Sequence, residues 1–219
     1  MNLLDAPVRE VAWAAIDFEG SGADPGQSDE AVQVGIATLP PGGKEPGNFF
    51  RSFIRAESRV TRAASSVHRI TNRDLEGAPP LAVLWPEIKS RLSGAVVVAH
   101  GAGAEKRFLR AFPMHGFGPW VDTLALARSA LPDLPDHSLG SVIAACGLGP
   151  TVRRLCPDYD WHDALFDAAA SLVFLRHFLL HPGAGQAVVG QFVSGDTAAY
   201  NRGRRVRRAA RDLGLHGLG

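Results

Sequence analysis

The feature that most constrains the fold is a series of three apolar runs in the first quarter of the chain. They cover residues 11–18, 31–37 and 48–54, and segments rich in Gly and Pro separate them. Short runs of this kind, bounded by turn residues and containing Val, Ile and Phe, are typical of buried strands. Short links between consecutive strands favour antiparallel neighbours, so we expect a three-stranded meander.

Helical and strand-like segments alternate farther along the chain. Residues 81–93 place apolar side chains at helical spacing, and the apolar run 95–99 that follows is typical of a buried strand. We also expect a helix from 104 toward 112, an apolar segment at 120–124, a helix near 138–146 stopped by Gly147 and Gly149, and a long helix over 163–181. This alternation predicts right-handed crossovers and parallel pairing. The expected fold class is therefore α/β, with a mixed β-sheet of antiparallel meander plus parallel strands, flanked by α-helices.

Composition indicates one sizeable core. The 219 residues are 46% hydrophobic and 21% charged, which is ordinary for a globular protein. We expect a domain over residues 1–183 and a basic C-terminal tail or extension over 184–219. Residues 1–11 lack the apolar centre of a signal peptide, and no run of eighteen apolar residues occurs. The expected protein is soluble and cytoplasmic, without a membrane partner.

Charge is distributed unevenly along the chain. From residue 184 onward six arginines stand against two aspartates, so this part has a net charge of +4 and the remainder has −3. A mildly acidic body argues against tight binding of long duplex DNA by charge alone, because Lys and Arg contacts to phosphate supply most non-specific affinity. The arginine-rich segment 204–213 is compatible with a basic helix or with disorder.

Two acidic residues, Asp17 and Glu19, end the first apolar run, and Gly20-Ser21-Gly22 follows them. Residues i and i+2 of a strand point to the same face, so both carboxylates would emerge together at the strand end. Two carboxylates this close repel each other unless a cation lies between them. The pair therefore predicts a divalent-metal site.

Far downstream, His162 and Asp167 add a histidine and a third carboxylate. A separation of five residues corresponds to about 140° around a helix, so one regular helix cannot turn both side chains toward one metal. The consistent arrangement places His162 in the preceding loop, Asp163 near the helix start and Asp167 in an early turn facing the strand of Asp17. His162 would then overhang the site, as a general base requires.

Five segments of the chain together resemble the ordered motifs of one enzyme family. They are Asp17-Phe18-Glu19 with Ser21-Gly22, residues 66–71, residues 97–109, Val121-Asp122-Thr123-Leu124 and residues 162–168. This set resembles the DEDDh 3′→5′ exonucleases, which include the proofreading subunit of bacterial DNA polymerase III, ribonuclease T and oligoribonuclease. The resemblance runs from about residue 11 to about residue 181, and it implies a ribonuclease H-like fold.

The resemblance also implies a reaction and its ligands. Two Mg²⁺ or Mn²⁺ ions would be held by Asp17, Glu19, Glu105 and Asp167, with His162 as general base and with Asp17 and Glu19 counted among the catalytic residues. The terminal nucleotide would lie against Gly20, Ser21 and Gly22. Apart from the resemblance, His68 is a candidate substrate contact, and Trp161, beside the expected general base, is a candidate for stacking on a nucleobase. The substrate would be the 3′ end of single-stranded DNA or RNA, and the products nucleoside 5′-monophosphates.

The chain departs from the family pattern in two places. The second motif carries Gly101, Ala104 and Glu105 where the family usually has Asn, Phe and Asp, and Arg69 stands where Gly is usual. Glutamate is one methylene longer than aspartate, and metal sites are sensitive to small displacements. An alternative function therefore stays open: a catalytically weak exonuclease-like module that binds nucleic acid or a polymerase partner.

Further partners stay open at this point. Residues 186–192 resemble a sliding-clamp peptide with irregular spacing, so a DNA polymerase or a clamp is a candidate partner. The motifs concern the phosphodiester and the 3′ end and not the 2′-position of the sugar, so they do not distinguish a DNA substrate from an RNA substrate. A monomer and a homodimer are both compatible with the sequence. Gly101-x-Gly103 imitates a dinucleotide-binding fingerprint, but Lys106 occupies the position that needs a small residue.

Overall fold

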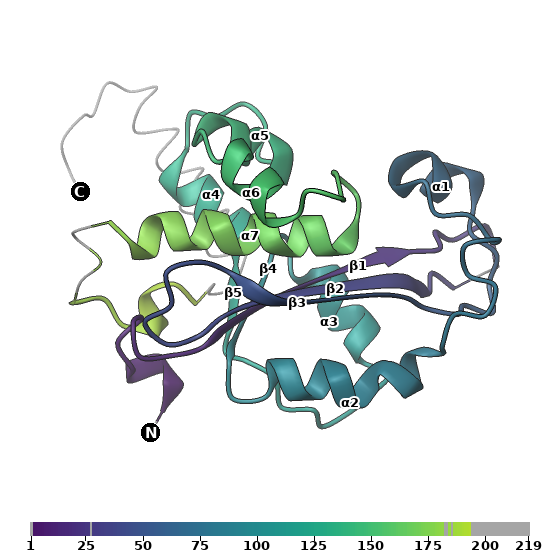
Figure 1. Ribbon diagram of the computed structural model, residues 1–219, viewed down its shortest axis with the longest axis horizontal. Helices are drawn as coiled ribbons and strands as arrows, with labels where there is room; N and C mark the ends of the chain where they lie inside the picture. Colours follow the sequence, from purple (N-terminus) through teal and green to yellow (C-terminus); the bar gives the residue numbers. More distant parts are fainter. Residues whose placement is uncertain (1, 27, 182–183, 185, 194–219) are drawn as a thin grey trace.

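The centre of the molecule is a five-stranded sheet with helices on both faces, as Figure 1 shows for the computed structural model. The structure describes residues 2–26, 28–181, 184 and 186–193. The strands are β1 Trp13–Gly20, β2 Ala31–Leu39, β3 Gly47–Phe53, β4 Val96–Ala99 and β5 Trp120–Asp122. Their order across the sheet is β3-β2-β1-β4-β5.

The strands of the sheet pair as predicted, with an antiparallel part and a parallel part. β1, β2 and β3 form an antiparallel meander, whereas β4 pairs parallel to β1, and β5 parallel to β4. β1 is therefore the central strand, and the carboxyl ends of β1, β4 and β5 lie at one edge of the sheet. Ligands in open α/β sheets bind at such an edge. The predicted mixed sheet is confirmed.

Within the described residues, seven α-helices surround the sheet. They are α1 Arg62–His68, α2 Leu81–Leu92, α3 Gly103–Leu109, α4 Thr123–Ala130, α5 Leu139–Ala145, α6 Gly149–Leu155 and α7 Ala164–Leu179. Two short 3₁₀ helices, η1 Leu3–Asp5 and η3 Val189–Gln191, lie near the ends of the described chain. In Figure 1, α4 to α7 cover one face of the sheet, and α2 and α3 cover the other.

Several helix predictions need correction. α1, α4 and α6 were not expected, and residues 66–68 of the family-like segment belong to α1. Gly147 ends α5 with a φ of 67°, as predicted, but Gly149 does not stop a helix; it is the first residue of α6. Pro150 next to it favours this start, because proline suits the first turn of a helix. α3 ends at Leu109, so Phe112 lies outside it, with its ring stacked 3.9 Å from that of Trp85.

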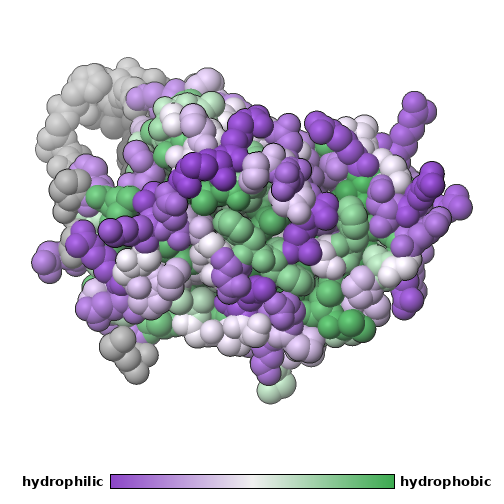
Figure 2. All heavy atoms as spheres, in the orientation of Figure 1, coloured by the Kyte–Doolittle hydropathy of each residue, from purple (hydrophilic) through white to green (hydrophobic). Residues whose placement is uncertain are grey.

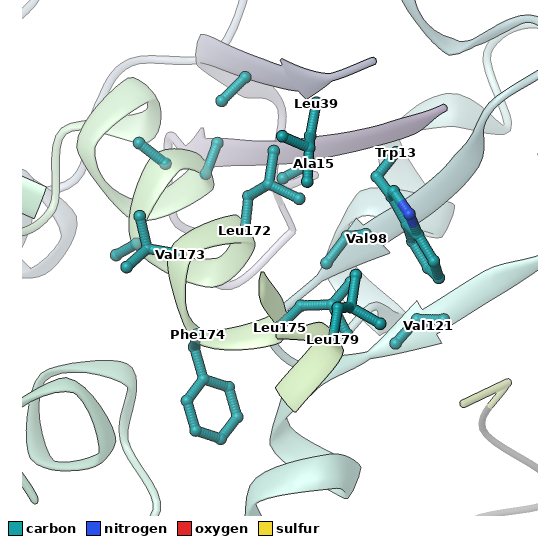
Figure 3. Close-up of a cluster of buried hydrophobic side chains, with 14 of the residues drawn as sticks. Trp13, Ala15, Leu39, Val98, Val121, Leu172, Val173, Phe174, Leu175 and Leu179 are labelled. Atoms are coloured by element: carbon teal, nitrogen blue, oxygen red, sulfur yellow. The ribbon is translucent and has the colours of Figure 1, made fainter. Parts of the chain in front are cut away.

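The two faces of β1 bury different side chains. Trp13 and Ala15 belong to the core cluster beneath α7, which Figure 3 shows in close-up, whereas Ile16 and Phe18 belong to the cluster shared with α2 and α3. Side chains alternate between the faces of a strand. Asp17 therefore continues the α7 face, as does Glu19. The acidic pair emerges where the apolar contact between α7 and the sheet ends.

A glycine in β2 brings α7 against the sheet. Gly35 is the register partner of Asp17. A Cβ added at Gly35 would lie 2.1 Å from the carbonyl carbon of Ala164 and from the backbone nitrogen of Leu165. Only glycine permits this approach of two backbones. The first turn of α7, which carries Asp167, is consequently held beside the strand that carries Asp17.

The segment after α7 returns to the beginning of the chain. The backbone nitrogen of Val8 donates to the carbonyl of Ala187 at 3.0 Å, and that of Val189 donates to the carbonyl of Ala6 at 3.0 Å. Residues 186–193, which contain the clamp-like sequence, thus pack against the N-terminal residues. A domain boundary at residue 183 stays a prediction, and segment 204–213 lies outside the described residues.

The surface facing the viewer in Figure 1 is mixed in character. Hydrophilic side chains are spread over this face, with apolar ones visible between them (Figure 2), as on most water-exposed protein surfaces. Among the described residues, no helix combines the length and apolar character needed to cross a membrane.

Candidate active site

Three predicted site residues meet at the carboxyl end of β1. Glu19, His162 and Asp167 each offer one ligand atom, and these atoms all lie within 4.8 Å of one another. Glu19 comes from β1, His162 from the turn before α7 and Asp167 from the first turn of α7. The fold therefore brings together residues that are more than 140 positions apart in sequence.

The N-terminus of α7 has the arrangement that the spacing predicted. His162 lies outside the helix with a φ of 66°, and Asp163 is the N-cap, whose side chain accepts from the backbone nitrogen of Leu165 at 3.1 Å. The backbone nitrogen of His162 donates to Oδ2 of Asp167 at 3.2 Å. The left-handed conformation of His162 leaves its side chain exposed beside the carboxylates.

Two residues that the sequence reasoning missed anchor this helix end to the sheet. Gln33 on β2 donates from Nε2 to Oδ2 of Asp163 at 3.1 Å and accepts from the backbone nitrogen of Ala164 at 2.8 Å. Arg51 on β3 donates from Nε to the same Asp163 oxygen at 2.7 Å. The signal for Gln33 was a single amide inside an otherwise apolar strand, since a buried polar group needs a partner.

The carboxyl groups hold their protons unusually tightly. The pKa of Asp17 is raised well above its usual value, mainly because burial disfavours the charged form and also because Asp167, Glu105 and Glu19 face it. Burial and the charge of Asp167 likewise raise the pKa of Glu19 to about 8. Burial raises the pKa of Asp167 to about 7, against the hydrogen bond from His162. Such mutual repulsion is relieved when a cation binds.

Unsatisfied oxygens support the same conclusion. Oε2 of Glu105 and Oδ1 of Asp167 are buried and have no hydrogen-bond partner within the described chain. Burial also raises the pKa of Glu105 to about 7. A buried carboxylate oxygen without a donor is costly, and hard oxygen ligands suit Mg²⁺ or Mn²⁺. The residues present therefore fit a divalent-metal centre.

Glu105 approaches the cluster from the other face of the sheet. It lies in α3, and it faces Asp17 closely enough to raise the pKa of that carboxyl group. The loop that leads into α3 is held by Asp122, which accepts from the backbone nitrogens of Gly101 at 2.9 Å and Ala102 at 3.2 Å. Gly101 has a φ of 85°, which suits glycine. The sequence reasoning gave Asp122 no positioning role.

The loop after Glu19 is closed by the carboxylate of Asp29, which the sequence reasoning did not single out. Ser21 is fully buried, and its Oγ accepts from the backbone nitrogen of Glu30 at 3.0 Å. Asp29 accepts from the backbone nitrogen of Gly22 at 2.9 Å and pairs with Arg107 of α3 at 2.5 Å. A Cβ at Gly20 would lie 2.5 Å from Oδ1 of Asp29. The loop is thereby tied to the helix that carries Glu105.

His68 supports this loop from α1. Its Nδ1 accepts from the backbone nitrogen of Ile70 at 3.0 Å, so a neutral ring carries its proton on Nε2 and donates to the carbonyl of Gly20 at 3.0 Å. Burial lowers the pKa of His68, which favours this neutral form. Both nitrogens are therefore engaged by backbone, and His68 holds Gly20 in place.

A polar groove of about 540 Å³ opens beside the cluster. His68, Trp161 and His162 line it, together with Arg51, Arg69, Arg153 and Tyr159. Trp161 packs edge-on against Phe166, with ring centroids 4.9 Å apart. The groove thus combines aromatic surface, hydrogen-bond donors and access to the carboxylates, which is the chemistry needed to hold a nucleotide.

Comparison with known proteins agrees with this geometry. The exonuclease family named for RNase T matches residues 14–175. DNA polymerase III PolC-type of Thermotoga maritima is 33% identical over 178 residues, covering 78% of this chain and 12% of the relative. A DNA polymerase III subunit epsilon-like protein of Rhodobacter capsulatus is 27% identical, covering 80% of this chain and 25% of the relative. The chain thus spans a quarter or less of the length of these relatives.

Solved structures share the fold. Exonuclease X, in complex with 5′ overhanging duplex DNA, superposes with a TM-score of 0.67 at 21% identity, covering 83% of this chain and 99% of that one. The nuclease domain of 3′hExo, a DEDDh family member bound to rAMP, gives a TM-score of 0.64 at 16% identity, covering 84% and 98%. The predicted ribonuclease H-like architecture is confirmed.

Proposed function

The chain belongs to the RNase T exonuclease family, and we propose that it hydrolyses phosphodiester bonds from the 3′ end of single-stranded nucleic acid, releasing nucleoside 5′-monophosphates. The observation that carries the proposal is the cluster of Glu19, His162 and Asp167 within 4.8 Å of one another. Asp17, on the same strand as Glu19, and Glu105, on α3, complete the carboxylate cluster. A basic imidazole beside several carboxylates suits metal-assisted hydrolysis of a phosphate ester.

The four carboxylates would hold two Mg²⁺ or Mn²⁺ ions. When bound, the ions would neutralise phosphate charge, increase the acidity of the attacking water and stabilise the leaving 3′-oxygen. Asp17 and Glu19 are supplied by a rigid central strand, and Asp167 by a helix that Gly35 holds against it. The buried oxygens without donors on Glu105 and Asp167 support their assignment as ligands.

His162 is the proposed general base. Its side chain is exposed at the mouth of the cluster, while its backbone nitrogen is fixed to Asp167. Histidine is the side chain that exchanges protons near neutral pH, and a base must lie within reach of the water that it activates. The turn before α7 therefore gives the imidazole access to substrate while the backbone of the turn stays anchored.

The terminal nucleotide would lie between the loop at Gly20 to Gly22 and the groove. Trp161 offers an aromatic surface for a base, and His68 acts on the substrate through the carbonyl of Gly20, which it holds. An unpaired base can reach such a surface, whereas a stacked and paired one cannot. This supports a single-stranded 3′ end, of DNA or RNA, as the substrate.

Direction and chemistry can be tested together. Oligonucleotides of DNA and RNA, labelled at either end, would be incubated with Mg²⁺ or Mn²⁺. Stepwise shortening from the 3′ end is expected, and Asp17→Ala and His162→Ala should each remove most of it, about 10²-fold or more. His177→Ala serves as the control, because His177 lies exposed at the far end of the same helix. The proposal fails if the pure wild-type chain digests none of these substrates with either ion.

A second candidate function rests on Glu105. If the longer side chain holds its ion poorly, the chain would bind nucleic acid, or a polymerase of the kind its relatives belong to, with little cleavage. Glu105→Asp separates the two candidates, because it restores the shorter ligand without changing charge. A gain of about tenfold or more in cleavage rate from a weak wild type favours the binding module. A loss of rate favours the exonuclease with Glu105 as a working ligand.

A further inference from the structure

We propose that Arg69 binds a phosphate of the substrate strand other than the one being cleaved. The inference rests on the proposed function, and it assigns to this chain a preference for oligonucleotides over single nucleotide esters. It begins from the backbone of Arg69, which is the residue that ends α1.

Arg69 occupies a conformation that usually belongs to glycine. It is the C-cap of α1, with φ 65° and ψ 0°, and its backbone nitrogen donates to the carbonyl of Ser65 at 2.9 Å. Glycine is the common residue in this left-handed position, because a Cβ is disfavoured there. Glycine would make the same backbone hydrogen bond. The helix end therefore does not need the arginine side chain.

The side chain has no partner in the part of the chain that the structure describes. Arg69 is exposed, and no hydrogen bond or ion pair joins its guanidinium to another described residue. It lines the same groove as His162 and Trp161. The left-handed backbone of a non-glycine residue that lines the groove is the observation from which we infer a ligand for this side chain.

The other arginines of the groove are already compensated. Arg51 is held by Asp163 at 2.7 Å and lies over the ring of Tyr159 at 5.0 Å, and Arg153 lies 3.5 Å from Asp160. Of the three described arginines that line the groove, Arg69 is the one without an ion pair, although Asp158 also belongs to the lining. A guanidinium with free N–H groups is well suited to bind a phosphate with two hydrogen bonds.

Arg69 lies on a different element from the carboxylates that would face the scissile phosphate. The scissile phosphate must lie over Asp17, Glu19 and Asp167, which belong to β1 and α7. Arg69 belongs to α1, one residue beyond His68, whose Nε2 holds the carbonyl of Gly20. Because the 3′-terminal nucleotide carries no phosphate other than the scissile one, the arginine is assigned the next phosphate on the 5′ side of the scissile bond, and a substrate with one phosphate does not use it.

The test compares a strand with a single nucleotide ester. Arg69→Gly should raise KM for a ten-nucleotide single strand about tenfold with little change in kcat, because a charge-assisted contact of about 1.4 kcal/mol is lost. Hydrolysis of thymidine 5′-monophosphate p-nitrophenyl ester, which has one phosphate, should be unchanged. Tm should rise by about 2–4 °C as the left-handed strain is relieved. If Arg69 had only a structural role, its replacement by glycine would not raise Tm and weaken substrate binding at the same time.

Two further variants sharpen the result. Arg69→Lys should recover part of the loss, since it keeps the charge. Arg59→Ala removes an exposed arginine from the loop before α1 and should leave KM unchanged. An unchanged KM in Arg69→Gly, or an equal loss on both substrates, would overturn the assignment.

Binding distinguishes failure of this inference from failure of the proposed function. Anisotropy of a 5′-fluorescent ten-nucleotide strand, measured with Mg²⁺, would compare His162→Ala with the double variant His162→Ala, Arg69→Gly. About tenfold weaker binding of the double variant supports the role of Arg69 even if the wild type cleaves nothing. Equal binding, or none by either protein, overturns it.

Discussion

The two sides of the carboxylate cluster are held in different ways. The N-terminus of α7 rests on the backbone of β2 at Gly35 and is fixed by side chains of two strands, Gln33 and Arg51. Glu105, by contrast, lies in the short helix α3, and a loop held by the carboxylate of Asp122 leads into it. The α7 side leaves no space for an added atom at Gly35, whereas the α3 side accommodates the longer side chain of Glu105, which is buried. The departure from the family pattern falls on the α3 side.

Gly35→Ala should break the α7 side most severely. The added methyl group would overlap the backbone of Ala164 and Leu165, so α7 must shift or the strand must bend, at a cost of about 3 kcal/mol or more. Thermal unfolding measures the loss. Gly47→Ala on β3 is the matched control, because nothing lies within 4 Å of the added Cβ there. Similar Tm values for the two variants would contradict the close approach.

Gln33→Leu should loosen the same helix end without steric conflict. It removes the acceptor for the buried backbone nitrogen of Ala164 and a donor to Asp163, which costs about 2 kcal/mol. The turn with His162 should shift with it, so cleavage should fall about 10²-fold. A variant with lowered Tm but full cleavage would show that α7 is positioned by Gly35 alone.

The proton affinity of the cluster predicts how metal-free stability depends on pH. The pKa values of Glu19, about 8, and Asp167, about 7, lie above those of an unfolded carboxyl group. These groups therefore favour the folded state at low pH and cost stability as the pH rises from about 4 to about 8. Glu19→Gln should be more stable than the wild type at pH 8 in EDTA, by at least about 1.4 kcal/mol, and about equally stable at about pH 3.5, where the carboxyl group is protonated in both folded and unfolded states.

Adding Mg²⁺ should invert this difference. The ion neutralises the wild-type carboxylates, so Tm should rise in the wild type and much less in Glu19→Gln. Differential scanning fluorimetry at both pH values, with and without the ion, checks both statements. A stability difference between the proteins that does not change with pH would argue against the repulsion.

Asp122→Ala should have the smallest effect and act on the α3 side. It removes the acceptor for the backbone nitrogens of Gly101 and Ala102 and the N-cap of α4, which costs about 1 kcal/mol. Glu105 should lose its fixed position, so cleavage should fall about tenfold, less than in Gln33→Leu. The ratio of cleavage rates of Asp122→Ala and Gln33→Leu in an exonuclease assay measures how differently the α3 side and the α7 side of the cluster depend on their supporting residues.

The sequence anticipated those parts that depend on local pattern. Short apolar runs bounded by turn residues predicted the strands, and the helical angle between His162 and Asp167 required His162 to stand outside α7, as it does. The helices α1 and α6 were missed because each buries a single residue and so shows no apolar periodicity, and α4 was missed because it begins directly after β5, inside the apolar segment 120–124.

The supporting side chains were missed for a different reason. Gln33 and Asp163 are 130 positions apart, and Arg51 and Asp163 are 112 apart. A hydrogen bond over such a separation exists only once the sheet has brought β2 and β3 beneath α7. The ligands could be recognised from motifs, but the residues that aim them depend on tertiary contacts that no local pattern contains.

The hydrogen bonds that tie residues 187–189 to residues 6–8, with Pro7 and Val188 forming an antiparallel bridge between them, have a consequence for how this fold can be joined to other protein. The polypeptide enters and leaves the domain at neighbouring points, near the start of β1, whereas the carboxylates lie where β1 ends (Figure 1). A domain with adjoining entry and exit can be spliced into a longer chain without being stretched. Any polypeptide joined there would start at the end of the domain away from the carboxylate cluster, leaving the opposite side open.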